Sequence, residues 1–364
     1  MGRSVWQMFL KKANNNSSMK RIQGYRGFGK KGTVLILVLW VLSFLSVFAL
    51  SIGISVRQNI QVLSRLDKRA KISLIATAGI HKARAIINTT YKVKALRDSA
   101  QSKKLWFNNR PGFRKKKVGR GFFDVTYIDY DEGADQPRER FGVVDEGGKI
   151  NVNHEGRSVL KRLIKDVLGE NDEDAGHLAN MIIDWRRYGE SEITGFFSDE
   201  YYENLEFPYV PKKSDFEVLD ELLLVEGVTR DIYKRLINFT TIYGDGKVNI
   251  NTAPRQVLSA LGLSETLVGA ILFARRGEDE IEFTEDDFVF HVAHNIGLNL
   301  DRLVKLEDSE MQEIDALIKQ NKLKTGLSLF RLRSQGQLES KGEKVVIECV
   351  FNAEDDKIIY WHES

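Results

Sequence analysis

Acidic residues between Asp184 and Glu206 have the types that could bind a metal ion. Glu190, Asp199 and Glu200 lie close in sequence around a turn-like stretch. Calcium takes six to eight oxygen ligands, mostly from carboxylates and carbonyls, so this segment could hold calcium. A solvated acidic loop would have the same composition, and both interpretations stay open at this point.

The remaining candidates for chemistry are sparse. His291 and His294 are three residues apart but have no HExxH pattern or nearby cysteine, which favours packing or surface histidines over a zinc pair. No phosphate-binding glycine loop, GxSxG or CxxC occurs. Cys349 is the single cysteine and lies on the apolar face of its predicted strand, so we expect a small buried side chain. We therefore predict no catalytic residue and no enzyme.

An uncharged apolar run from Thr33 to Val56 determines how the rest of the chain is placed. As a helix it would reach about 36 Å, which is enough to cross a hydrocarbon core of about 30 Å. The residues before it carry many basic groups and no acid, which predicts a cytoplasmic N-terminus and an exported remainder. The run is longer than the apolar core of a cleaved secretory signal, so a retained single-pass helix is favoured.

The helical pattern continues past the membrane, because no proline occurs before Asp98. Apolar residues recur at three- and four-residue intervals, which predicts one helical face packed on a sheet. The residues of this predicted face are Leu63, Leu66, Ala70, Leu74 and Ala78.

Strand patterns occur on both sides of a helical middle segment. Alternation predicts a hairpin from the runs 123–130 and 140–144, and further strands over 330–334, 345–352 and 358–361. The basic stretch 103–120 is interpreted as a solvated loop, although it could also touch anionic lipid or nucleic acid.

An internal repeat occupies the helical middle. Gly148–Asn153 recurs as Gly246–Asn251, and Arg186 after an apolar residue is echoed by Arg275. A repeat of this kind indicates one supersecondary unit used twice, here a helix, a tight turn and a helix. In the second copy Thr252 is the expected N-cap of the first helix.

Helix-hairpin-helix units elsewhere bind DNA phosphates through backbone N–H groups. Here the turn 261–265 has one glycine and a carboxylate, which disfavours a phosphate. The net charge of +3 is supplied by the N-terminal basic segment, so the exported part is slightly acidic. We expect no nucleic-acid partner, and a membrane-anchored DNA receptor stays as the alternative.

Three motifs together resemble the minor pseudopilin K family of type II secretion, whose members are type IV pilin-like. They are Lys30-Lys31-Gly32 before the apolar run, the stretch 199–202 followed by 216–229, and Val248–Pro254. The resemblance covers almost the whole chain after Lys31.

The resemblance implies an α+β, pilin-like fold, with a long N-terminal transmembrane helix on an antiparallel sheet and a large inserted helical domain with helix-hairpin-helix-like repeats. The expected parts are a cytoplasmic leader (1–32), a transmembrane and fibre-core helix (33–56), a pilin-like helix with the first strands (57–148), the inserted domain (149–324) and the C-terminal strands (325–364).

The family resemblance also implies function and partners. A subunit of this family sits at the tip of the pseudopilus with the minor pseudopilins I and J, starts assembly and limits fibre length during protein export. Other pseudopilins, prepilin peptidase, the inner-membrane assembly platform and membrane lipid are further expected partners. A minor pilin of a related type IV pilus is a second alternative.

Two positions carry the prepilin part of the resemblance. Cleavage by prepilin peptidase, followed by methylation, is expected between Gly32 and Thr33. Most pilins have a glutamate as the fifth mature residue, whereas this position is Leu37. A subunit with no neighbour above it would gain nothing from an unpaired carboxylate in apolar surroundings.

The resemblance also bears on calcium. Family members often have further aspartates after an Asp-Trp pair and bind calcium nearby, but here Asp184-Trp185 is followed by Arg186 and Arg187. This departure predicts a weakened or lost site near Glu190, Asp199 and Glu200, and no confident cofactor.

Overall fold

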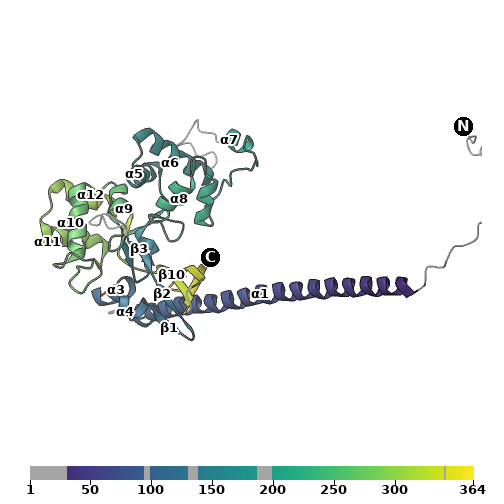
Figure 1. Cartoon of the computed structure of the whole chain (residues 1–364). Coiled ribbons are helices and arrows are strands. Elements are labelled where there is room, and N and C mark those ends of the chain that lie inside the picture. Colours follow the sequence, from purple (N-terminus) through teal and green to yellow (C-terminus); the bar gives the residue numbers. More distant parts are fainter. Residues whose placement is uncertain (1–30, 94–98, 130–137, 187–198, 340–341) are drawn as a thin grey trace, which may run out of the picture. The chain divides into compact units, whose positions relative to one another are not determined.

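The computed structural model describes residues 31–93, 99–129, 138–186, 199–339 and 342–364. The chain divides into two compact units, Met1–Arg65 and Leu66–Ser364. One continuous helix, α1 (Lys31–Tyr91), runs through most of the first unit and into the second (Figure 1).

The apolar part of α1 packs against nothing else in the described chain. The stretch from Gly32 to Lys71 is exposed throughout. Among the described residues, this helix is the one long and apolar enough to span a membrane. Trp40 is 74% exposed. Apolar area of this extent needs lipid or protein around it.

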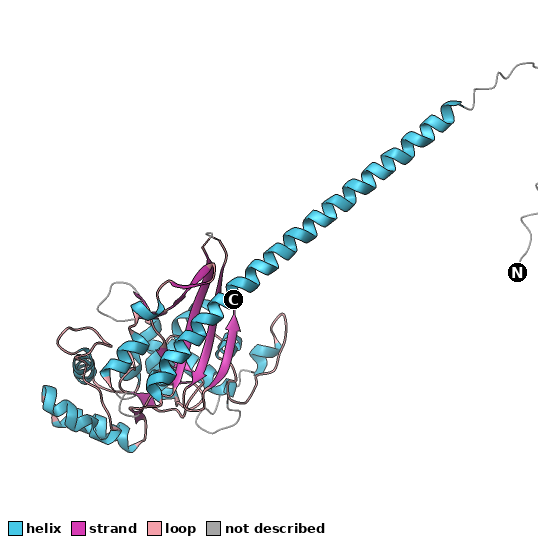
Figure 2. Ribbon diagram, turned by 90° about the horizontal axis from the view of Figure 1, so that it is seen from below, coloured by secondary structure: helices cyan, strands magenta, loops and turns pink. Residues whose placement is uncertain are grey.

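An antiparallel sheet forms the centre of the pilin-like part of the second unit. Its strand order is β1-β2-β10-β11-β12, and the short β5 pairs with the beginning of β10. The C-terminus lies at the end of β12 (Figure 2). The strand bounds are β1 Lys116–Val118, β2 Gly121–Val125, β5 Val144–Asp145, β10 Leu329–Leu338, β11 Lys344–Asn352 and β12 Lys357–Glu363.

The predicted C-terminal strands are confirmed. The alternation of β11 places Val345, Ile347 and Cys349 in the core, as expected for residues on one face of a strand. The Cys349 side chain is fully buried, and burial raises the pKa of its thiol to about 12. The thiol is therefore protonated at neutral pH, as a structural side chain would be.

The helix does lie on the sheet, but the predicted face was wrong. Leu74 is 69% exposed, and Leu63 and Leu66 are exposed as well. The buried face is instead made of Ile72, Ile75, Ala76, Ile80, Ala83 and Ile87. Both sets repeat with helical spacing, so the sequence pattern alone could not tell which one meets the sheet.

Small residues decide which face meets the sheet. A Cβ on Gly336 of β10 would lie 2.6 Å from the Ile72 carbonyl oxygen and 2.7 Å from the Ala76 nitrogen. A Cβ on Gly79 would similarly meet Phe123 and Ser334. Backbone of the helix and backbone of the sheet thus approach each other directly, which only the face with alanine and glycine permits.

The basic stretch 103–120 is not the solvated loop that was predicted. It contains most of α3 (Ala100–Phe107), all of α4 (Arg110–Phe113) and β1. Trp106, Phe107 and Phe113 are at most 2% exposed and belong to the same core as the buried face of α1. Lys103 is buried as well, whereas Arg110, Arg114 and Arg120 are exposed.

The predicted hairpin is confirmed only in its second half. β3 (Tyr127–Asp129) pairs with β4 (Arg138–Arg140) as a separate two-stranded sheet, whereas β2 turns away to pair with β1 and β10. The chain therefore leaves the main sheet after Val125.

A second hydrophobic core belongs to the helical middle of the chain, from Ile150 to Leu323. Its helices are α5 Arg157–Leu168, α6 Asp172–Arg186, α7 Asp199–Glu203, α8 Arg230–Leu236, α9 Arg255–Ala260, α10 Glu265–Arg276, α11 Ile296–Val304 and α12 Asp308–Lys319. Three 3-10 turns are Glu146–Gly148, Leu219–Leu224 and Ala293–Asn295. Short parallel pairs join β6 Ile150–Asn151 to β7 Thr240–Thr241 and β8 Val248–Asn249 to β9 Leu323–Lys324.

The helix–sheet contact makes a direct prediction. Replacing Gly336 with valine should lower the stability of the second unit by about 1–3 kcal/mol, because the new side chain overlaps the α1 backbone. This corresponds to roughly 2–12 °C in melting temperature, measured by circular dichroism. Gly326→Val is the matched control, since Gly326 is exposed and a Cβ there meets nothing within 4 Å. Equal shifts for both variants would contradict the close contact.

Candidate functional site: an exposed assembly helix and a charged joint

The expected cleavage point lies at the very beginning of α1. Gly32 and Thr33 are in its first turn, both exposed, and a Cβ on Gly32 would meet nothing within 4 Å. Leu37 is 64% exposed, one turn further along. Cleavage between Gly32 and Thr33 stays a prediction, and so does the assignment of Leu37 to the position where most pilins carry an acid.

The internal repeat is confirmed by its hydrogen bonds. In the first copy the Asn153 side chain donates to the Phe216 carbonyl at 3.0 Å and accepts from the Phe216 N–H at 2.9 Å. In the second copy Asn251 makes the same two bonds with Phe290, at 2.8 and 2.9 Å. Each buried asparagine therefore holds a distant loop against the beginning of its own hairpin.

The repeated arginines are also equivalent. Arg186 donates to the carbonyl of Glu155, and Arg275 donates to the carbonyl of Ala253, which occupies the corresponding position in the second copy. Both side chains are at most 4% exposed. Arg275 further pairs with Glu282 at 2.8 Å, so its charge serves packing within the chain.

The hairpin N–H groups are occupied by the chain's own acceptors. The Ser264 N–H, at the start of α10, donates to the Glu313 carboxylate at 2.7 Å. In the first hairpin the N–H groups of Glu173 and Asp174 donate to the Asn171 side chain at 2.9 Å. A phosphate at the second hairpin would have to displace the Glu313 carboxylate, so this geometry argues against DNA binding there.

Asp145 fastens the second repeat to the edge of the sheet. Its Oδ2 atom accepts from the Asn249 amide at 2.7 Å and from the Thr252 hydroxyl at 2.6 Å, while Oδ1 accepts from the Gly147 N–H at 2.9 Å. Burial raises the pKa of this carboxyl above its usual value, against the effect of these donors. Thr252 is therefore a partner of Asp145, and the predicted N-cap is wrong because α9 is capped by Pro254.

Glu146, the next residue, binds the first repeat and the sheet together. Its Oε1 atom accepts from Arg331 of β10 at 2.6 Å and from Lys149 at 2.9 Å, and Oε2 accepts from the Thr241 hydroxyl. Arg331 also pairs with Glu348 of β11 at 2.5 Å. Burial alone would raise the pKa of Glu146, but the positive charges of Arg331 and Lys149 outweigh it and hold that pKa well below its usual range.

We call the group Asp145, Glu146, Lys149, Arg331 and Glu348 the charged joint. It links the main sheet to both repeats within the second unit, because Asp145 and Glu146 are consecutive and face different partners. Both carboxylates are at most 4% exposed. Buried charges of this kind are tolerated only when paired and fully hydrogen-bonded, so the joint fixes one arrangement of its three neighbours.

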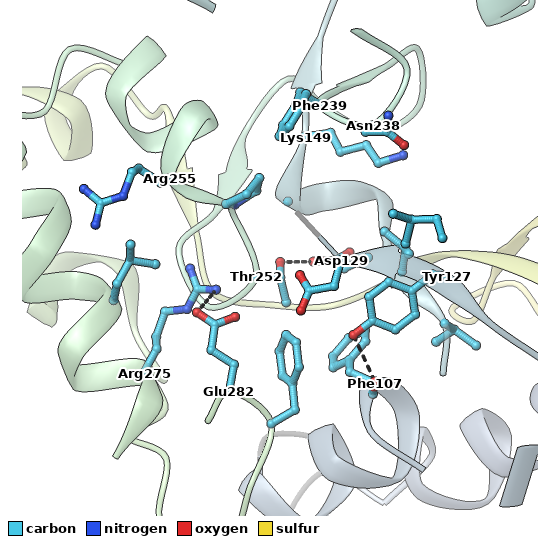
Figure 3. Close-up of a pocket in the computed structure, with 18 of the residues that line it drawn as sticks. Phe107, Tyr127, Asp129, Lys149, Asn238, Phe239, Thr252, Arg255, Arg275 and Glu282 are labelled. Carbon is cyan, nitrogen blue, oxygen red and sulfur yellow. Dashed lines mark hydrogen bonds and ion pairs between the residues drawn. The ribbon is translucent and has the colours of Figure 1, made fainter. Parts of the chain in front are cut away.

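A pocket of about 110 Å³ lies beside the joint (Figure 3). Tyr127 donates to the Phe107 carbonyl at 3.0 Å, and Arg275 lies beside Glu282, with which it pairs. Burial raises the pKa of Tyr127 far above its usual value, and the negative charge of Asp129 is the next largest cause. Arg275 pairs with Glu282 within the lining, whereas Lys149, Asp129 and Arg255 pair with residues outside it. These described residues form no nucleophile–base pair.

The calcium prediction falls largely outside the described residues. Glu190 is outside them, and for Asp199 the structure describes the backbone in α7 but not the side chain. Glu200 is exposed in the same helix. His291 and His294 are both exposed.

The structure groups another set of acids that sequence reasoning missed. Ligand oxygens of Asp279, Asp286 and Asp287 lie within 4.8 Å of one another. Asp286 already accepts from the Glu278 N–H at 2.7 Å, and burial raises the pKa of Asp287 to about 6. The dense acidic run after Gly277 was the available signal in the sequence.

The first of two positive comparisons concerns the segment around the joint. Residues 134–245 match the protein family described as "Type II secretion system (T2SS), protein K". Over this segment, the chain is similar to the protein K family of type II secretion. The matched segment contains Asp145, Glu146 and Lys149 of the charged joint and the first repeat.

The second comparison concerns the fold. The structure is similar to a chain in "The Crystal Structure of the GspK-GspI-GspJ complex from enterotoxigenic Escherichia coli Type 2 Secretion System", with a TM-score of 0.57, 13% sequence identity, and coverage of 83% of this chain and 98% of that chain. The predicted mixed fold, with a long helix on an antiparallel sheet, is confirmed. The comparison with curated proteins finds no match.

The motif that carried the resemblance to the K family has a structural role. The Glu221 carboxylate accepts the N–H groups of Glu217 and Val218 at 3.0 and 3.2 Å and binds Lys212 at 3.0 Å. Phe216 is 3% exposed and is the residue held by Asn153. These residues therefore shape the loop before α8.

We expect the isosteric replacement of Glu146 in the charged joint to lower stability strongly. Glu146→Gln should destabilise the protein by about 3–5 kcal/mol, because Lys149 loses its carboxylate and Arg331 loses one of two. Glu354→Gln at an exposed position is the matched control. Urea unfolding followed by fluorescence measures both.

The same variant also makes a pH prediction. The folded-state pKa of Glu146 lies below its unfolded value, so its stabilisation is present above about pH 4.3 and is lost as the pH falls through the folded pKa. The difference in the free energy of unfolding between wild type and Glu146→Gln should be largest near pH 7 and should decrease below about pH 4. A difference that increases in acid would contradict this assignment.

Proposed function

We propose that this chain acts as a minor pseudopilin at the tip of a type II secretion pseudopilus, where it starts assembly and limits fibre length during protein export. The observation that carries the proposal is α1, one helix that is apolar and uncovered over its first part and packed on a pilin-like sheet over its second. Such a helix suits lipid before assembly and neighbouring helices afterwards.

Leu37 supports the tip position. In a fibre core, a carboxylate is favourable only when a neighbouring amino terminus neutralises it. A leucine there removes the need for a subunit above, which is the situation of the last subunit. Because the adjoining face of α1 also exposes Leu63, Leu66 and Leu74, packing on the sides remains available.

The expected partners follow from the family and the fold. We propose the minor pseudopilins I and J as the direct neighbours, consistent with the similarity to a chain of the GspK–GspI–GspJ complex. Other pseudopilins, prepilin peptidase, the assembly platform and membrane lipid complete the proposed set. The proposed location is the bacterial inner membrane, with a cytoplasmic N-terminus, and then the pseudopilus tip. We propose no catalytic role for the chain.

Processing at Gly32 tests the prepilin assignment. Co-expression with prepilin peptidase should remove residues 1–32, leave methylated Thr33 as the first residue and be blocked in Gly32→Trp; intact-mass spectrometry reads all three. Gly53→Trp is the matched control, because Gly53 also lies in α1 with nothing within 4 Å of a Cβ. An unchanged mass beside an active peptidase, or a block by both variants, would contradict the proposal.

We also propose that the acidic segment near Glu190, Asp199 and Glu200 keeps a weakened calcium site. Calcium at 100 times its dissociation constant should then stabilise the protein by about 2.7 kcal/mol. Neutralising these three residues should abolish the rise in melting temperature, whereas Asp286→Asn in the other acidic cluster should preserve it. Loss of the rise only in Asp286→Asn would move the site to that cluster.

A further inference from the structure

A cavity of about 330 Å³ lies between the main sheet and the helical middle of the chain. Its walls come from β10, β11 and β12 on one side and from the segment Leu219–Asp220, α8 and Tyr243 on the other. A volume near 300 Å³ is the lower end of the range for small-molecule sites. Its lining residues are not part of the assembly helix, and three of them belong to the charged joint.

Two arginines of β10, Arg331 and Arg333, line this cavity, and only Arg331 is paired with described carboxylates. Arg331 is neutralised by Glu146 at 2.6 Å and Glu348 at 2.5 Å. Arg333, two residues along the strand and therefore on the same face, forms no ion pair with any described residue. Its one hydrogen bond goes to the Thr126 hydroxyl at 3.4 Å. Among the described residues, no carboxylate therefore balances the charge of the Arg333 guanidinium in this cavity.

The acids in the same wall do not balance it. Glu348 binds Arg331, and Asp220 accepts the Tyr233 hydroxyl. Both carboxylates line the cavity with their charges directed to these partners.

Two tyrosines add further donors. The hydroxyls of Tyr243 and Tyr360 line the cavity and make no hydrogen bond to a described residue. Burial raises the pKa of Tyr243 to about 12, so its hydroxyl keeps its proton at neutral pH and can donate. A half-buried guanidinium and two phenolic donors together match the acceptor oxygens of a carboxylate.

We propose that this cavity binds a carboxylate group, with Arg333 as the charged anchor and Tyr243 and Tyr360 as additional donors. The arginine fork can bind both carboxylate oxygens at once, which a lysine could not do. The ligand class is either a small dicarboxylate or the carboxylates of a short acidic peptide. This inference goes beyond the pseudopilin role, and neither requires the other.

The experiment uses full-length protein in lipid nanodiscs and isothermal titration calorimetry. The probes are succinate, the peptide Ac-Glu-Glu with a carboxyl end, the same peptide amidated at its end, and succinamide as the uncharged control. We expect saturable binding of at least one carboxylate probe and none of succinamide. Binding of succinate identifies a small-molecule site, and preference for the peptide with a carboxyl end over the amidated one identifies chain-end recognition.

Variants connect the binding to the cavity. Arg333→Gln should weaken binding by about 10- to 100-fold, because charge-assisted hydrogen bonds contribute about 1.5–3 kcal/mol. Arg302→Gln, an exposed arginine of α11, should leave it unchanged. If Arg333→Gln fails to fold, the double variant Tyr243→Phe with Tyr360→Phe decides, since it removes two donors and keeps the rings. Absence of binding up to 10 mM of every carboxylate probe, or equal affinity in the variants, would overturn the proposal.

Discussion

Two adjacent buried carboxylates hold the second unit together. Asp145 ends the short strand β5, and its carboxylate binds Asn249 and Thr252 of the second repeat. Glu146 follows it and binds Arg331 of the sheet. Neither carboxylate could be buried without its donors, because an unpaired buried charge would be far too unfavourable. The sheet and the two repeats must therefore keep the one arrangement that supplies donors to both carboxylates.

The helix α1 must meet two requirements. Its first part must be apolar all round, since nothing in the described chain covers it, while its second part must offer small residues to the sheet. Gly79, Ala76 and Ala83 satisfy the second requirement, and the leucines on the opposite face stay exposed. In the proposed function, exchanging lipid for neighbouring helices keeps these leucines in apolar surroundings.

Sequence patterns predicted the features that have a strong period or an obvious repeat. The strands β10 to β12 alternate cleanly, and the repeat of Asn151–Asn153 as Asn249–Asn251 is visible by eye. The buried face of α1 could not be predicted, because two apolar faces compete and backbone contact at Gly336 chooses between them.

Other buried residues could not be predicted, because the sequence around them has the composition of an exposed loop. Trp106 and Phe113 have basic residues on both sides in the sequence, which favours a loop. Their aromatic rings are nevertheless buried in the core. Asp145 and Glu146 precede two glycines and would ordinarily mark an exposed turn; their partners come from distant parts of the chain. Such sites follow from tertiary contacts that no local pattern contains.

The central claim is that this chain ends a pseudopilus. Its most direct test is electron microscopy of pseudopili from cells in which the chain is absent, normal or overproduced, with an antibody against the region after Leu66. We expect label at one end of each fibre, longer fibres without the chain and shorter ones when it is abundant. Label distributed along the fibres, with lengths that do not respond to its amount, would contradict the account.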